Sequence, residues 1–181
     1  MKKKSNLLAT LCIIAAFLLC TNAKAQSTGS KFRLGIGIDG LVPVGNLTNT
    51  TDFGLGITPR LQYTFNNNFA LTFTSGFYHF FGKKIPLDQA LGVSGTIKTN
   101  LEIVPVKAGA KYFVTPSIYL GGEAGVGFEV ENGGGPADLL ISPSVGYATK
   151  DWEVGLRYEI LSNQHSSAGF LGLRIAYGFG L

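Results

Sequence analysis

Apolar and polar residues alternate along most of the chain, and the last segment shows this most clearly. In residues 170–181, FLGLRIAYGFGL, an apolar side chain stands at every second position from Leu171 to Leu181. Strict alternation predicts a β-strand with one apolar face, because successive side chains of a strand point to opposite sides. After residue 25, no stretch carries the 3.6-residue period of a helix, so the pattern predicts an all-β protein.

Eight segments of this kind follow one another, each bounded by turn-forming residues. We expect strands at Phe32–Val42, Phe53–Phe65, Phe69–Phe81, Thr99–Val114, Ile118–Val130, Leu139–Thr149, Trp152–Leu161 and Gly169–Leu181. Most of these segments have the length that a tilted strand needs to cross a bilayer.

The connections between the expected strands alternate in length. The short ones are Asn66–Asn68, Thr115–Ser117 and Lys150–Asp151; the long polar ones are Pro43–Asp52, Gly82–Lys98, Glu131–Asp138 and Ser162–Ala168. Short turns at one end and long loops at the other are typical of outer-membrane barrels. The sequence therefore predicts an eight-stranded, antiparallel, up-and-down transmembrane β-barrel, closed by pairing of the last strand with the first.

The charged residues fall opposite the apolar rows. If each apolar row faces lipid, the lumen-facing rows carry six positive and six negative side chains: Arg33, Asp39, Arg60, Glu102, Lys107, Lys111, Glu123, Glu129, Glu153, Arg157, Glu159 and Arg174. The interior of an eight-stranded barrel is just wide enough to be filled by side chains. We therefore expect a structural network of ion pairs in a closed lumen, with no catalytic residues, metal or cofactor.

One strand fits this assignment only with a change of register. Leu101 and Ile103 point outward by parity, whereas Val106, Ala108 and Ala110 continue the apolar row on the other parity. We predict a β-bulge near Val104-Pro105, a position where proline is tolerated because it cannot donate a hydrogen bond to the ladder.

The first 25 residues differ from the rest. Three lysines precede an apolar run from Leu7 to Cys20, and Ala23-Lys24-Ala25 offers small residues at both positions that signal peptidase requires. We expect a signal peptide at residues 1–25 and a barrel domain at 26–181. Lipidation of Cys20 is the alternative, but the preceding Phe17-Leu18-Leu19 lacks the small residue of a lipoprotein site.

Removal of the signal peptide changes the charge balance. Four of the 15 basic residues leave with it, namely Lys2, Lys3, Lys4 and Lys24. The remaining chain therefore has 11 basic and 11 acidic residues. A chain of balanced charge has no electrostatic footprint for nucleic acid, and we expect no such partner.

The chain resembles the small outer-membrane β-barrel proteins common in Bacteroidetes. The resemblance lies in the alternating strands, the segment Leu101-Glu102-Ile103-x-Pro105, the Gly155–Tyr158 stretch and the final strand. Those proteins are similar in architecture to the outer-membrane protein A and X barrels. The resemblance implies a monomer in the bacterial outer membrane with periplasmic termini. Its partners would be membrane lipid, lipopolysaccharide and the barrel-assembly machinery, which recognises the terminal strand. The motifs specify no activity.

Other functions remain open at this stage. Residues Arg157–Asn163 resemble the segment that carries the catalytic histidine and serine of lipid A deacylases, but Ile160 stands at the histidine position, while Ser162 matches and His165 lies nearby. A narrow pore is a second alternative, and a soluble lipocalin-like carrier is a weaker third. We favour a structural or surface-binding role, with four extracellular loops as the candidate interaction surface.

Overall fold

The computed structural model describes residues 31–45, 48, 51–86, 96–98, 100–130, 137–162 and 167–181. The predicted signal peptide lies outside these residues. None of the described residues belongs to a helix that is long and apolar enough to span a membrane.

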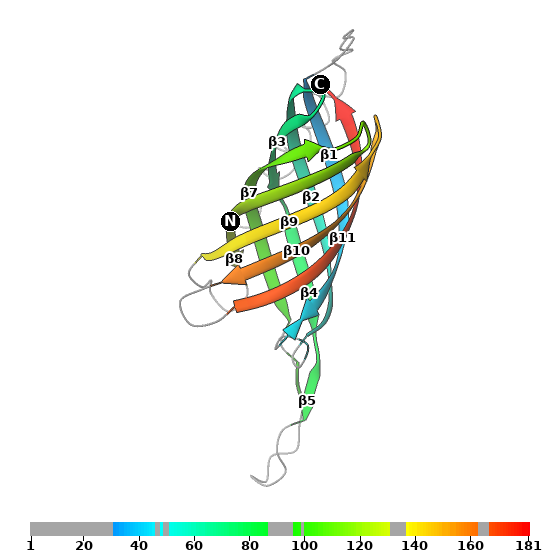
Figure 1. Ribbon diagram of the computed structural model, residues 1–181. Coiled ribbons are helices and arrows are strands. Elements are labelled where there is room, and N and C mark those ends of the chain that lie inside the picture. The colour runs from blue at the N-terminus through cyan, green and yellow to red at the C-terminus, as the bar shows by residue number, and fades with distance from the viewer. Residues whose placement is uncertain are drawn as a thin grey trace, which may run out of the picture. The chain divides into compact units, whose positions relative to one another are not determined.

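Eleven strands run through the described part of the chain. They are β1 (Phe32–Val44), β2 (Thr51–Asn66), β3 (Phe69–Ser75), β4 (Phe77–Gly82), β5 (Lys84–Pro86), β6 (Thr96–Lys98), β7 (Leu101–Phe113), β8 (Ile118–Glu129), β9 (Asp138–Ala148), β10 (Trp152–Ser162) and β11 (Ser167–Gly180). Strands β5 and β6 pair only with each other, in the connection between β4 and β7. The other nine form one sheet, in which each strand is antiparallel to its neighbours (Figure 1).

The sheet closes on itself. Strand β1 pairs with β2 on one side and with β11 on the other, so that Asp39 lies opposite both Gly56 and Arg174. Strands β3 and β4 occupy one position between β2 and β7, which makes eight strands around the barrel. The predicted closure of the last strand onto the first is confirmed. It leaves no open strand edge in the wall.

The division between β3 and β4 coincides with two prolines. The ladder to β7 keeps one register on both sides of Gly76, with Ser75 opposite Val106 and Tyr78 opposite Ile103. In that register Pro59 of β2 and Pro105 of β7 flank the break, and neither can donate a ladder hydrogen bond. Gly76 also passes so close to β2 that a side chain there would collide with the backbone of Ile57 and Thr58.

Side-chain oxygens stabilise the three tight turns. The backbone N–H of Phe69 donates to Asn66 Oδ1 (2.9 Å), that of Ile118 to Thr115 Oγ1 (2.9 Å) and that of Trp152 to Thr149 Oγ1 (3.0 Å). Asn and Thr favour turns because they offer such local acceptors. These turns, the start of β1 and the end of β11 lie at one end of the barrel, called here the short-turn end; the opposite end is the long-loop end.

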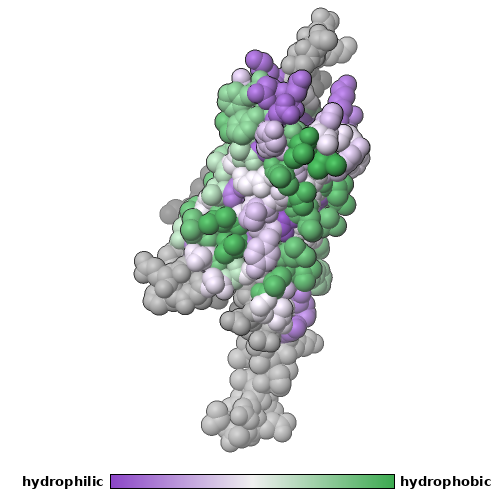
Figure 2. Space-filling model, viewed as in Figure 1, coloured by the Kyte–Doolittle hydropathy of each residue, from purple (hydrophilic) through white to green (hydrophobic). Residues whose placement is uncertain are grey.

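The outer face of the wall is apolar. Ile38 lies opposite Ile57 and Ile175, and these three side chains expose 66%, 61% and 47% of their surface. Figure 2 shows hydrophobic side chains over much of the visible wall, with the most strongly hydrophilic ones near its ends and a strip of weakly hydrophilic ones across its middle. A continuous apolar surface of this extent is rare on soluble monomers and is typical of a face that contacts membrane lipid.

Aromatic rings follow the outer face at the short-turn end. Phe32 contacts Tyr63 with ring centroids 4.7 Å apart, Trp152 contacts Tyr177 at 5.1 Å, and Tyr177 contacts Phe179 at 4.8 Å. Rings gathered at this level are typical of the aromatic girdle at a membrane interface.

The interior changes character along the barrel. Toward the long-loop end it is filled by seven buried side chains, called here the apolar plug: Leu41, Tyr78, Phe80, Ile103, Leu140, Leu161 and Phe170. The rings of Phe80 and Phe170 meet across the barrel with centroids 4.5 Å apart. Toward the short-turn end the inward side chains are charged.

The apolar plug explains why the predicted bulge is wrong. Strand β7 pairs with β8 in one uninterrupted register from Ile103 to Phe113. Leu101 and Ile103 therefore point inward, Ile103 with 2% exposure, and no slip is needed. The prediction assumed that every apolar row faces lipid, whereas here the inward row becomes apolar where it enters the plug.

Candidate functional site

The charged interior consists of side chains from the inward rows of six strands, which meet across the barrel. Arg60 of β2 forms one centre. Its Nη1 donates to Glu153 Oε1 at 2.7 Å, its Nη2 lies 3.2 Å from Glu123, and its Nε donates to Thr74 Oγ1 at 2.8 Å. Glu153 also accepts from Lys111 Nζ at 2.5 Å and from the Tyr119 hydroxyl at 2.9 Å. One carboxylate thus receives hydrogen bonds from three strands.

A second centre lies next to the apolar plug. Glu159 of β10 accepts from Lys107 Nζ at 2.5 Å and from the Tyr78 hydroxyl at 3.1 Å, and Arg157 Nε lies 2.7 Å from it. Arg157 Nη2 donates to the same Tyr78 hydroxyl at 2.8 Å. Lys107 lies 3.6 Å from Glu123, which links this centre to the first.

Asp39 connects the network across the closing seam of the barrel. Its Oδ1 lies 2.9 Å from Arg157 Nη1 and its Oδ2 lies 3.5 Å from Arg174 Nη1. The Thr58 hydroxyl donates to Asp39 and accepts from Arg174, whose Nη2 also donates to the Thr58 carbonyl at 3.0 Å. The network therefore ties β1 and β11, the two strands whose pairing closes the wall.

All members of this network are buried. The side chains of Asp39, Lys107 and Glu159 expose 1% or less, and no side chain in the ion pairs of Arg60 or Lys111 exposes more than 8%. Burial of charges is costly unless their geometry is good and their remaining hydrogen-bonding groups are satisfied. Hydroxyl groups satisfy some of these hydrogen-bonding groups, since those of Thr72 and Thr74 both donate to Glu123 Oε1.

Nine of the twelve side chains expected in the lumen are joined in this network: Asp39, Arg60, Lys107, Lys111, Glu123, Glu153, Arg157, Glu159 and Arg174. Arg33 faces inward but lies at the short-turn mouth, where Nη1 donates to the Thr149 carbonyl at 3.3 Å. Glu129 ends β8 at the long-loop end, beside Ile103 of the plug.

The assignment of Glu102 to the lumen is wrong. Because β7 has no bulge, Glu102 lies on the outer face near the long-loop end, where its Oε1 is 3.1 Å from His79 Nδ1. Both side chains are about one-third exposed, and the His79 ring contacts Phe81. This pair sits at the rim of the wall, outside the network.

Several lumen residues were not singled out from the sequence. Gln62, Thr58 and Ser142 are buried hydrogen-bonding partners of the charged groups, as is the Tyr78 hydroxyl. The inward parity of Thr58 and Gln62 was visible in the alternation, because both occupy the same row as Arg60, whereas no predicted lumen charge lies on the strand of Ser142. The inward position of Tyr78 and Phe80 could not be recognised from the alternation, because Phe77 and Phe81 on the outer row are equally apolar.

The deacylase-like segment does not form a catalytic arrangement in the described residues. Ile160 points to the outer face, its neighbour Leu161 is buried in the apolar plug, and Ser162 ends β10 partly exposed. His165 lies outside the described residues. Among those described, no group of three or more His, Cys, Asp or Glu side chains could hold a metal ion.

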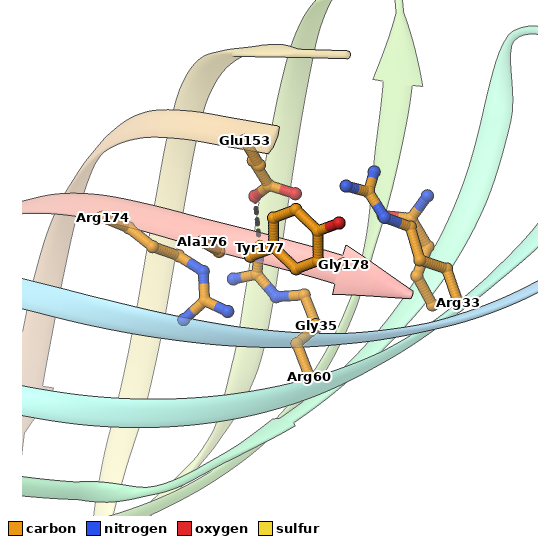
Figure 3. Close-up of a pocket in the computed structure, with 9 residues that line it drawn as sticks. Arg33, Gly35, Arg60, Glu153, Arg174, Ala176, Tyr177 and Gly178 are labelled. Carbon is orange, nitrogen blue, oxygen red and sulfur yellow. Dashed lines mark hydrogen bonds and ion pairs between the residues drawn. The ribbon is translucent and has the colours of Figure 1, made fainter. Parts of the chain in front are cut away.

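Two small spaces lie between the described side chains of the charged interior. One, shown in Figure 3, is lined by Arg33, Arg60, Arg174, Glu153 and Gln62 together with small residues of β1 and β11. A second lies deeper, between Arg60, Tyr119, Arg157 and Arg174. In each, about 10 Å³ is open to the centre of a water-sized sphere, which is about the space that one water molecule requires.

Comparisons with known proteins agree with this architecture. Ail from Yersinia pestis, in a phospholipid bilayer nanodisc, superimposes with a TM-score of 0.57 at 14% identity, over 81% of this chain and 99% of that one. Neisserial surface protein A superimposes with a TM-score of 0.52 at 18% identity, over 84% of this chain and 98% of that one. At these identities the likeness concerns the fold alone. No curated protein matches in sequence.

The family of the chain follows from its sequence profile. The profile of the outer membrane protein beta-barrel domain matches residues 11–179, which include all strands of the wall except the last residue of β11. The chain belongs to this family of bacterial outer-membrane β-barrels.

Proposed function

We propose that the protein is a closed outer-membrane barrel with a structural or surface-binding role, in which the wall anchors the chain and the loops carry the interactions. The observation that carries the proposal is the filling of the lumen by the buried ion-pair network and the apolar plug, one above the other. Such an interior would leave no wide path along the barrel axis between the described residues. The predicted ion-pair role of the lumen side chains is part of this proposal.

The proposed orientation places both termini and the short turns in the periplasm and the long loops outside the cell, as in other barrels of this type. The apolar wall would contact membrane lipid, and the long-loop end would lie among lipopolysaccharide. The β5–β6 hairpin lengthens the loop between β4 and β7 and adds to this candidate binding surface. A monomer, assembled by machinery that recognises β11, and a relationship to Bacteroidetes barrels remain predictions.

A conductance measurement distinguishes the proposed closed barrel from the alternative, a pore. We expect purified protein in planar lipid bilayers to show no steady conductance, because the network and the plug occupy the barrel interior in series. The conductance should stay absent when the long loop is shortened by removal of residues 84–98, since none of the seven residues of the apolar plug belongs to this segment. Reproducible single-channel steps from the unmodified protein would overturn the closed-lumen proposal.

We also propose that the protein is not an enzyme. The support is the outward position of Ile160 at the place where the deacylase-like segment would need histidine, on the apolar side of the wall. A serine nucleophile requires a base within hydrogen-bonding distance and a third group that orients the base. Ser162 has no such neighbours among the described residues.

Export with cleavage after Ala25 is a further expectation. Mature protein from the outer membrane should begin at Gln26, because Ala23 and Ala25 occupy the small-residue positions of the cleavage site. Intact-mass measurement of the purified protein checks the cleavage site. A mature chain that begins with a lipidated Cys20 would contradict it and would make the protein a lipoprotein.

A further inference from the structure

Positive side chains outnumber negative ones in the part of the lumen between the apolar plug and the short-turn end. Six cationic side chains face the interior: Arg33, Arg60, Lys107, Lys111, Arg157 and Arg174. The buried network in this part of the lumen contains four carboxylates: Asp39, Glu123, Glu153 and Glu159. Two further inward carboxylates, Asp138 and Glu129, lie toward the long-loop end, level with the plug or beyond it. The charged part of the lumen therefore has two more positive than negative groups.

This surplus is concentrated at the short-turn end. Arg33, Arg60 and Arg174 line one small pocket, and Glu153 is the carboxylate among its lining residues. Glu153 already accepts from Arg60, Lys111 and Tyr119, so it has little capacity left for Arg174 or Arg33. Figure 3 shows the side chains of Arg33, Arg60 and Arg174, which come from β1, β2 and β11, around this pocket.

Arg174 has an unused donor. Its side chain is 3% exposed, its two Nη atoms serve Thr58 and Asp39, and its Nε is buried without a hydrogen-bond partner in the described residues. A buried donor without an acceptor is costly, and more so when it belongs to a charged group. Arg33 Nη1 donates to the Thr149 carbonyl at 3.3 Å.

The wall around this pocket is built from small residues. Gly35 lies opposite Gly178, and Gly37 lies opposite Ala176, all on the inward rows of β1 and β11. A side chain at Gly37 would occupy the position of the Arg174 guanidinium, and one at Gly178 would occupy that of Arg33. At Gly35 an added Cβ would meet its nearest neighbour, the Tyr177 carbonyl oxygen, at 3.6 Å, which is an ordinary van der Waals contact.

From these observations we infer that the short-turn mouth of the lumen binds one small monatomic anion, of the size of chloride, between Arg33, Arg60 and Arg174. The anion offsets part of the surplus positive charge and accepts a hydrogen bond from Arg174 Nε. The pocket holds about one water-sized particle, so that polyatomic anions such as sulfate or phosphate are too large. This inference does not rest on the proposed function, since a conducting barrel would also contain the site.

The test uses the complete barrel, labelled with ¹⁵N in lipid nanodiscs, and follows the Nε–Hε resonance of Arg174. Sodium chloride replaces sodium sulfate at constant ionic strength, so that screening does not change. We expect a saturable shift of this resonance. In Arg33→Gln the apparent affinity should fall at least about tenfold, the factor that one hydrogen bond to a charged group contributes. Arg33→Gln is chosen because Arg33 lies outside the buried network.

The matched control is Lys150→Gln, which removes one positive charge from an exposed turn at the same end of the barrel. It should leave the shift and the affinity unchanged. A resonance that does not move in the unmodified protein would mean that water fills the pocket and would overturn the inference. Equal weakening in Arg33→Gln and Lys150→Gln would also overturn it, because the response would then reflect general charge.

Discussion

Replacement of Ile175 by arginine is expected to lower the free energy of unfolding by roughly 2–4 kcal/mol, the cost of a cation on the lipid-facing row near the bilayer centre. Ile175 lies in the middle of β11 between Ile38 and Val154, and its side chain points outward with 47% exposure. Urea midpoints in liposomes measure the change. The shift of the folded band on unheated SDS gels reports whether the variant folds.

Ala176→Ser is the matched comparison for Ile175→Arg. Ala176 is the next residue of the same strand, faces the lumen and is 5% exposed beside the pocket of the three arginines. A hydroxyl group there meets polar neighbours, and we expect a change of less than about 1 kcal/mol. Equal tolerance at both positions, or greater damage at 176, would contradict the assignment of the outer face to lipid.

Replacement of Glu159 by glutamine should lower the free energy of unfolding by about 3–5 kcal/mol. We expect no other replacement of a lumen carboxylate by its amide to have a larger effect. The change keeps the shape of the side chain but removes its charge. Lys107 at 2.5 Å and Arg157 at 2.7 Å then lose their nearest carboxylate in a site that exposes 1% of the Glu159 side chain. Chemical unfolding of the folded barrel in lipid measures the difference.

Glu102→Gln is the matched control, since it makes the same chemical change on the outer rim. Glu102 pairs with His79, and both are about one-third exposed. Pairs of this kind contribute about 0–1 kcal/mol. If Glu102→Gln proved as damaging as Glu159→Gln, the corrected register of β7 would be wrong, and the bulge expected from the sequence would have to be restored.

The sequence contains most of the information about the wall, because alternation with a period of two determines which row each side chain occupies. Asp39, Arg60, Arg157 and Arg174 could be placed inside from their parity alone. Their partners could not be predicted, because contacts across a barrel depend on its stagger and tilt, which no single strand encodes. The ion pairs of Asp39 with Arg157 and Arg174 are an example.

The failure at Glu102 has a physical cause. The rule that apolar rows face lipid holds only while the lumen stays polar, and the apolar plug breaks it near the long-loop end. The inward positions of Leu101 and Ile103 then resemble lipid-facing ones. The break between β3 and β4 at Gly76 was missed for another reason. It arises where Pro59 of β2 and Pro105 of β7 flank this strand from its two sides, and their positions opposite each other follow only from the register of the sheet.

The most direct test of the whole account measures which methyl groups touch lipid. In nanodiscs, nuclear Overhauser contacts between protein methyl groups and lipid acyl chains should be strong for Ile38, Ile57 and Ile175 on the outer face and absent for Leu41 and Ile103 of the apolar plug. No mutation is required, so that folding is not disturbed. Lipid contacts at Ile103, or their absence at the three outer isoleucines, would contradict the arrangement of apolar wall, charged lumen and apolar plug.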